Sequence, residues 1–95
     1  MGGGAGGNFG NTYGAKATKH GSQRLRERGF SKSDISKTRQ TRNVKTQKDG
    51  ARVYISESSS GRYNVIVEGD SGIITVLKNI SEKSLNRLAK NYDWR

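Results

Sequence analysis

Residues 44–78 read VKTQKDGARVYISESSSGRYNVIVEGDSGIITVLK, and this stretch decides the fold. Three turn signals divide it, the first of which, Asp49-Gly50, is typical of a two-residue hairpin turn. Between the turns, β-branched and aromatic residues predict strands over residues 44–48, 52–57, 62–68 and 73–78. The first is expected to be a short edge strand. The last is apolar on both faces, which favours a central position in the sheet.

Helical patterns flank the four strands along the chain. The first covers residues 16–28, is weakened by Gly21, and ends at Gly29, which is well placed as a C-terminal cap. The second starts with a Ser-x-x-Asp capping box at Ser31, and Ser81 caps a third. The predicted fold class is therefore α+β, with two N-terminal helices, a four-stranded antiparallel sheet and a C-terminal helix. We expect the helices to lie on one side of the sheet.

Composition divides the chain into two parts. Residues 1–14 contain seven glycines and no charged side chain. Such a segment cannot bury enough surface to offset its backbone entropy, so we expect a flexible linker at residues 1–14 and one compact domain at residues 15–95. A phosphate-cradling loop is the alternative for the glycines, but no strand precedes them.

Several chemistries are excluded by what the sequence lacks. The chain has no Cys and a single His, so it offers no disulfide scaffold, no thiolate ligand or nucleophile and no multi-histidine metal centre. No apolar run approaches the roughly 20 residues of a membrane span, and no signal-peptide core is present. We therefore expect no metal, no small-molecule cofactor and no membrane span.

The charge is strongly basic and unevenly distributed. The net charge is +10, and most of the excess lies in residues 1–50. A basic half-domain rich in arginine is typical of a polyanion partner, and nucleic acid is the favoured one. The first alternative is that the charge keeps a small protein soluble. The second is binding to a membrane surface, but this requires a helix with a large apolar face, and the helix around Leu25 has no such face.

The segment HGSQRLRER at residues 20–28 carries the candidate chemistry. At 100° per residue, His20, Arg24 and Arg28 lie on one face of a helix, and Glu27 is expected near His20 on the other flank. RNA can be cleaved by attack of its own 2′-OH on the neighbouring phosphate. An imidazole can exchange the protons of this reaction while fixed cations beside it hold the phosphate. The alternative is a surface or packing histidine.

A longer stretch resembles a known family. The run HGSQRLRERGFS at residues 20–31, followed by Asp34-Ile35 and by the strand Ile73-Ile74-Thr75-Val76, is similar to ribonuclease toxin domains of the barnase/EndoU/colicin/RelE-like (BECR) superfamily. These are C-terminal modules of contact-dependent growth inhibition and other polymorphic toxin systems. The resemblance covers about residues 19–80 and implies the same α+β fold. It also implies a metal-independent RNase, often tRNA-directed, and a cognate immunity protein, expected to be acidic. Such a domain is the tip of a larger secreted, cell-surface toxin and acts in the cytoplasm of the target bacterium.

Site residues follow from that resemblance one by one. His20 matches its catalytic histidine, Arg24 its phosphate-binding arginine, and Thr75 a hydroxyl that bonds a phosphate oxygen. Arg28 either contacts substrate or supports the helix end, and Glu27 is either a second acid/base group or a solvated charge. Two tyrosines, Tyr54 and Tyr63, are candidates for base stacking or proton transfer, unless they pack in the core. Three cations are candidates for contact with the RNA backbone, unless they are only solvated charges: Arg39, Arg42 and Lys45.

A rival interpretation makes the chain a non-catalytic RNA- or ribosome-binding module. It predicts salt-dependent binding without cleavage, and it would be favoured by an exposed aromatic platform, for which Tyr54, Tyr63 and Trp94 are the candidates.

Overall fold

Helices and strands follow one another in the predicted order in the computed structural model, which describes residues 17–59 and 61–95. The linker expected at residues 1–14 lies outside the described residues. The elements are α1 (Lys19–Glu27), α2 (Lys32–Arg39), β1 (Val44–Thr46), β2 (Arg52–Ser59), β3 (Arg62–Gly69), β4 (Gly72–Ser81) and α3 (Glu82–Asn91). The α+β class, with two N-terminal helices, a four-stranded antiparallel sheet and a C-terminal helix, is confirmed.

The strands form an antiparallel meander in the order β1-β2-β3-β4. The first hairpin is confirmed, but its loop is longer than two residues: the backbone N–H of Gln47 donates to the carbonyl of Ala51, and residues 48–50 lie between them. Gly50 has φ 95°, a conformation that L side chains rarely adopt. The Asp49 carboxylate accepts the Ala51 N–H at 3.0 Å, which closes the wider loop.

The prediction that the last strand is central was wrong. β4 is an edge strand, and β2 and β3 are central. Its apolar character has another cause, since Ile73 and Val76 pack in one core cluster and Leu77 packs against a second. Its outer edge is also covered near its start, where the Thr18 N–H donates to the Ile73 carbonyl at 2.9 Å. An edge strand covered in this way is apolar on both faces and protected from pairing with another chain.

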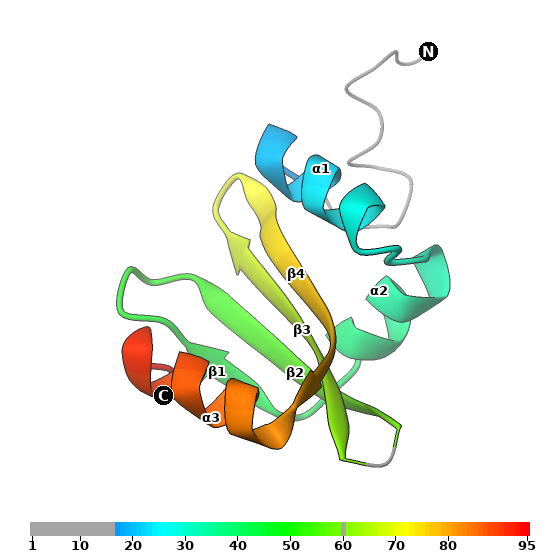
Figure 1. Ribbon diagram of the computed structural model, residues 1–95. Coiled ribbons are helices and arrows are strands. Elements are labelled where there is room, and N and C mark those ends of the chain that lie inside the picture. The colour runs from blue at the N-terminus through cyan, green and yellow to red at the C-terminus, as the bar shows by residue number, and fades with distance from the viewer. Residues whose placement is uncertain (1–16, 60) are drawn as a thin grey trace, which may run out of the picture.

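Helices cover both faces of the sheet, so the expectation of helices on one side was also wrong. Because successive strand residues point to opposite faces, Ile66 packs with α1 and α2 while its neighbours Val65 and Val67 pack in the cluster that holds Leu85 of α3. Figure 1 shows α3 apart from α1 and α2, with the sheet between them. The face that carries α3 is called the α3 face below.

Helix α1 begins later than predicted. At Gly21 it lies closer to β4 than any residue with a side chain would allow. Its N-cap is Thr18, whose hydroxyl accepts the Gly21 N–H at 2.9 Å, so the helix starts at Lys19 rather than residue 16. Gly21 is buried, and a Cβ at this position would lie 1.8 Å from the Ile73 carbonyl oxygen. The glycine that weakens the helical pattern is therefore the contact point between helix and strand.

The end of α1 is fixed by the predicted glycine cap. Gly29 has φ 63°, and the N–H groups of Gly29 and Phe30 donate to the carbonyls of Arg26 and Leu25. This is the Schellman arrangement, and its usual apolar contact is present because Phe30 and Leu25 belong to one core cluster.

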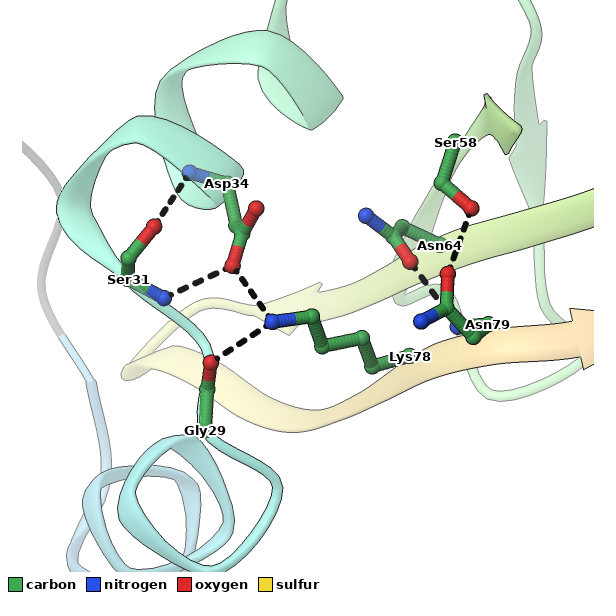
Figure 2. A network of polar contacts seen from close by, with 7 residues as sticks. All are labelled: Gly29, Ser31, Asp34, Ser58, Asn64, Lys78 and Asn79. Atoms are coloured by element: carbon green, nitrogen blue, oxygen red, sulfur yellow. Dashed lines mark hydrogen bonds and ion pairs between the residues drawn. The ribbon is translucent and has the colours of Figure 1, made fainter.

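A polar junction ties α1, α2 and β4 together (Figure 2). The Lys78 ammonium donates to the Gly29 carbonyl at 2.9 Å and pairs with the Asp34 carboxylate at 3.1 Å. Asp34 also completes the predicted capping box with Ser31. Burial acts to raise the pKa of Asp34, but the bonds from Ser31 and the Lys78 ammonium outweigh it and hold that pKa below its ordinary value.

This junction predicts an acid-sensitive contribution to stability. A carboxyl whose pKa is lowered by folding stabilises the fold above its unfolded pKa of about 4, and the contribution is lost as pH falls through the lower folded pKa. Asp34→Asn should therefore cost about 1 kcal/mol at pH 7, because the pair is partly exposed and the capping bond can persist. Urea unfolding at pH 7 and pH 3 measures the difference in unfolding free energy between this variant and the unaltered protein. That difference should be smaller at pH 3. Asp93→Asn removes one partner of the exposed pair with Arg95; it is the control and should have almost no effect. If Asp34→Asn costs as much at pH 3 as at pH 7, the ionised Asp34 carboxylate does not stabilise the fold as described.

Candidate active site

One cavity of about 320 Å³ brings together three of the residues that the sequence marks as functional. Arg24 of α1, Arg28 at the C-cap of α1 and Thr75 of β4 all line it. Thr75 is opposite Val67 in the β3–β4 register and so belongs to the α3 face. Because α1 runs along the β4 edge, its arginines reach the face of the sheet opposite to α2. The cavity therefore lies between α1 and α3, over the end of the sheet.

His20 is on the first turn of α1 and is exposed, outside the lining of this cavity. It precedes Arg24 by four residues, which is about 6 Å along the helix axis and the same side of the helix. Arg28 follows by a further turn. The three side chains therefore form a stripe along α1, called the His20 stripe below, whose two arginines border the cavity.

Arg24 is held by a carboxylate on its own helix. Its guanidinium donates to Glu27 Oε1 at 3.0 Å, and Gln23 donates to the other oxygen at 2.9 Å. The hydrogen bond from Arg24 holds the pKa of Glu27 below its ordinary value, so this carboxylate is ionised at neutral pH. The expected proximity of Glu27 to His20 does not occur, because seven residues of helix separate them by about 10 Å along the axis. Glu27 instead orients Arg24.

Two other candidates lie on the opposite face. The Arg39 guanidinium is 5.2 Å from the centre of the Tyr54 ring and is ion-paired with Glu68. Tyr54 packs against the core cluster of α1 and α2, away from the cavity. Both side chains thus have structural partners on the α2 side of the sheet.

The remaining candidates are not brought to the cavity either. Tyr63 is half-buried against the cluster on the α3 face and does not line the cavity. Arg42 and Lys45 are exposed, on the segment between α2 and β1 and on β1 itself. They extend the basic surface without joining the His20 stripe.

The opposite wall of the cavity was missed by the sequence analysis. It is formed by the last turn of α3, the chain that follows it, and the loop after β1, with the lining residues Leu88, Tyr92, Trp94, Gln47 and Asp49. Of these residues, the sequence marks only Trp94 as a functional candidate, for the rival interpretation, and Asp49 only as a turn residue. Because the helices were all expected on one face, no sequence signal placed α3 beside Thr75.

Within residues 17–59 and 61–95, no three His, Asp or Glu side chains gather where they could hold a metal ion. In the same part of the chain, no helix has the length and apolar character that crossing a membrane requires.

Comparison with known proteins gives no match: no family model, no curated protein and no solved structure matches this chain. What the fold and the cavity define is an α+β protein with a basic helix along one edge of its sheet. A more specific function has to be inferred from the side chains of the His20 stripe and the cavity.

Proposed function

We propose that this protein is a metal-independent endoribonuclease toxin, with tRNA as its target. The observation that carries the proposal is the meeting of Arg24, Arg28 and Thr75 at one cavity, on the side of α1 that also carries His20. The phosphate-binding arginine and the strand hydroxyl of the BECR resemblance, 51 residues apart in sequence, line the same cavity.

The proposed reaction uses the RNA's own nucleophile. The His20 imidazole takes the proton of the 2′-OH, the 2′ oxygen forms a bond to phosphorus, and the bond from phosphorus to the 5′ oxygen breaks. The departing 5′ oxygen receives the proton from the imidazolium. The products are a 2′,3′-cyclic phosphate and a 5′-OH, and no metal is needed in these steps.

The arginines and the hydroxyl stabilise the charge that develops on phosphorus. Arg24, oriented by Glu27, supplies N–H donors to the non-bridging oxygens, and Thr75 supplies a hydroxyl donor from the strand. Arg28 adds a second cation one turn along the stripe. Since α1 and β4 hold the backbones of these residues in place, only their side chains have to adjust as the charge forms.

The biological setting of the proposal comes from the same resemblance. The domain would be the tip of a larger secreted, cell-surface toxin of contact-dependent growth inhibition and would act in the cytoplasm of the target bacterium. A cognate acidic immunity protein would neutralise it by covering the cationic side of the cavity. Binding of that partner should then weaken as salt increases.

The proposal is tested by incubating the purified protein with tRNA and with total RNA, with and without EDTA. Discrete fragments that form at the same rate in EDTA are expected. A non-catalytic RNA-binding module would instead retain the RNA in a salt-dependent complex without cutting it. Intact RNA at high protein concentration would therefore reject the nuclease and favour that module.

The exposed cations beyond the cavity should act on binding rather than on chemistry. Arg42→Gln removes one potential phosphate contact, so the slope of log K against log salt for single-stranded RNA should fall by about 0.7. Filter binding to a 2′-O-methyl RNA, which cannot be cleaved, measures this slope between 50 and 200 mM salt, roughly the range over which phosphate contacts are lost. Lys83→Gln, an exposed charge on α3, is the control; the same loss of slope in both variants would reject a specific role for Arg42.

A further inference from the structure

We propose that the cavity is a nucleobase-binding subsite, in which one base of the RNA lies between α1 and α3 beside the phosphate held by Arg24 and Arg28. This rests on the proposed function in taking RNA as the substrate, and it assigns a role to residues of α3 and of the loop after β1. The cavity volume of about 320 Å³ is at the lower end of the range of small-molecule pockets, about 300–1,000 Å³.

The two walls differ in chemistry in the way that a nucleotide requires. Guanidinium groups of Arg24 and Arg28 stand on the α1 side, and two aromatic residues, Tyr92 and Trp94, stand on the α3 side. The aliphatic side chain of Leu77 lies in the same lining. A phosphate pairs with the first wall, and the flat apolar face of a base packs against the second.

The aromatic wall is held in place by β1 and the loop after it. The Trp94 indole N–H donates to Gln47 Oε1 at 2.9 Å, and the backbone N–H and carbonyl of Arg95 bond to those of Thr46. The Tyr92 carbonyl accepts the Lys48 N–H at 3.3 Å. The Tyr92 residue nevertheless remains 46% exposed. A large aromatic residue left open on a fixed segment beside a cavity is suited to stacking on a planar ligand.

A carboxylate completes the cavity opposite the arginines. Asp49 accepts hydrogen bonds from the Ala51 N–H at 3.0 Å and from Gln47 at 3.1 Å. These bonds hold the pKa of Asp49 below its ordinary value, so it offers only acceptor oxygens at neutral pH. All four bases can donate to it, adenine, cytosine and guanine through an exocyclic amino group and uracil through its ring N3–H. Asp49 should therefore contribute to the binding of any base.

The chain supplies its own probe, because Trp94 is its single tryptophan and lines the cavity. Tryptophan fluorescence is followed while AMP, CMP, GMP and UMP are added in turn, with ribose 5-phosphate and inorganic phosphate as ligands that lack a base. The four nucleotides should change the signal, and the two base-free ligands should not. A response to ribose 5-phosphate equal to that of the nucleotides would overturn the proposal.

Two variants assign the effect to the residues. Tyr92→Leu should weaken nucleotide binding roughly 10-fold while Tyr92→Phe retains it, as expected for stacking. Asp49→Asn should weaken nucleotide binding, because an amide oxygen is a weaker acceptor than a carboxylate. Unchanged affinity in Tyr92→Leu would also overturn the subsite. The readout is binding, so it is independent of cleavage: if RNA stays intact while base-dependent binding persists, the nuclease fails and the subsite stands.

Discussion

His20→Ala is expected to lower the rate of RNA cleavage by about 100- to 10,000-fold, the usual contribution of a general acid/base. The chain contains no other histidine, so no second imidazole can take over the proton transfer. The side chain is exposed on the first turn of α1, and its removal leaves the core contacts of Gly21 and Leu25 in place. The rate should be measured on tRNA under single-turnover conditions, with circular dichroism and thermal unfolding to confirm the fold.

Lys19→Ala is the matched control for this change, because Lys19 is an exposed residue of the same turn. It should cleave within a few-fold of the unaltered protein. If His20→Ala folds normally and cleaves as fast as Lys19→Ala, the catalytic assignment of His20 is wrong. Loss of activity in both variants would point to disruption of α1 rather than to lost acid/base chemistry.

Gly21→Ala is expected to cost about 3 kcal/mol of folding free energy or more. Alanine in a helix ordinarily gains about 1 kcal/mol over glycine. Here the added Cβ would lie 1.8 Å from the Ile73 carbonyl oxygen, and this oxygen belongs to backbone that cannot move aside without breaking the contact between α1 and β4. Thermal or urea unfolding measures the loss, which should lower the melting temperature by more than about 10 °C in a domain of this size.

Gly69→Ala provides a control that adds the same methyl group at another crowded glycine. Its Cβ would lie 2.9 Å from Ile74 Cδ1, the end of a flexible side chain that can rotate away, so the cost should stay below about 1 kcal/mol. If Gly21→Ala is as stable as Gly69→Ala, then α1 does not pack on β4 as described. The geometry that places Arg24 and Arg28 beside Thr75 would then be wrong as well.

The elements were predictable from the sequence because their signals are local. The capping box of Ser31 with Asp34, the N-cap Ser81 and the cap Gly29 each act within a few residues of the helix end that they fix, and all three are confirmed. Turn residues divided the strands in the same local way. These interactions hold whatever the helices later pack against.

The errors concern which element packs on which, which no local pattern encodes. β4 has the apolar pattern of a central strand, but it is an edge strand buried by α1 and α3. In the helical pattern Gly21 is a weak point, but in the fold its missing side chain allows the helix to approach Ile73. The position of α3 on the other face depends on long-range burial of Leu85.

The candidate site was predictable only on its α1 and β4 sides. Helical spacing and the resemblance placed His20, Arg24 and Arg28 on one stripe and singled out Thr75, and three of these four line the cavity. Tyr54 and Arg39 pair with each other on the opposite face, because strand alternation assigns Tyr54 to the α2 side. The wall formed by Tyr92, Trp94 and Asp49 was not predictable, because it depends on the packing of α3 on the face of the sheet opposite to α2.

The chemical identity of the RNA ends tests the central claim most directly. The purified protein is incubated with tRNA in EDTA, and the fragment ends are identified by mass spectrometry, beside a substrate with a 2′-O-methyl group at the cleaved nucleotide. The proposed reaction predicts a 2′,3′-cyclic phosphate and a 5′-OH, no cleavage of the methylated substrate, and no products from His20→Ala. Ends with a 3′-OH and a 5′-phosphate, or cleavage of the methylated substrate at the same bond, would contradict it.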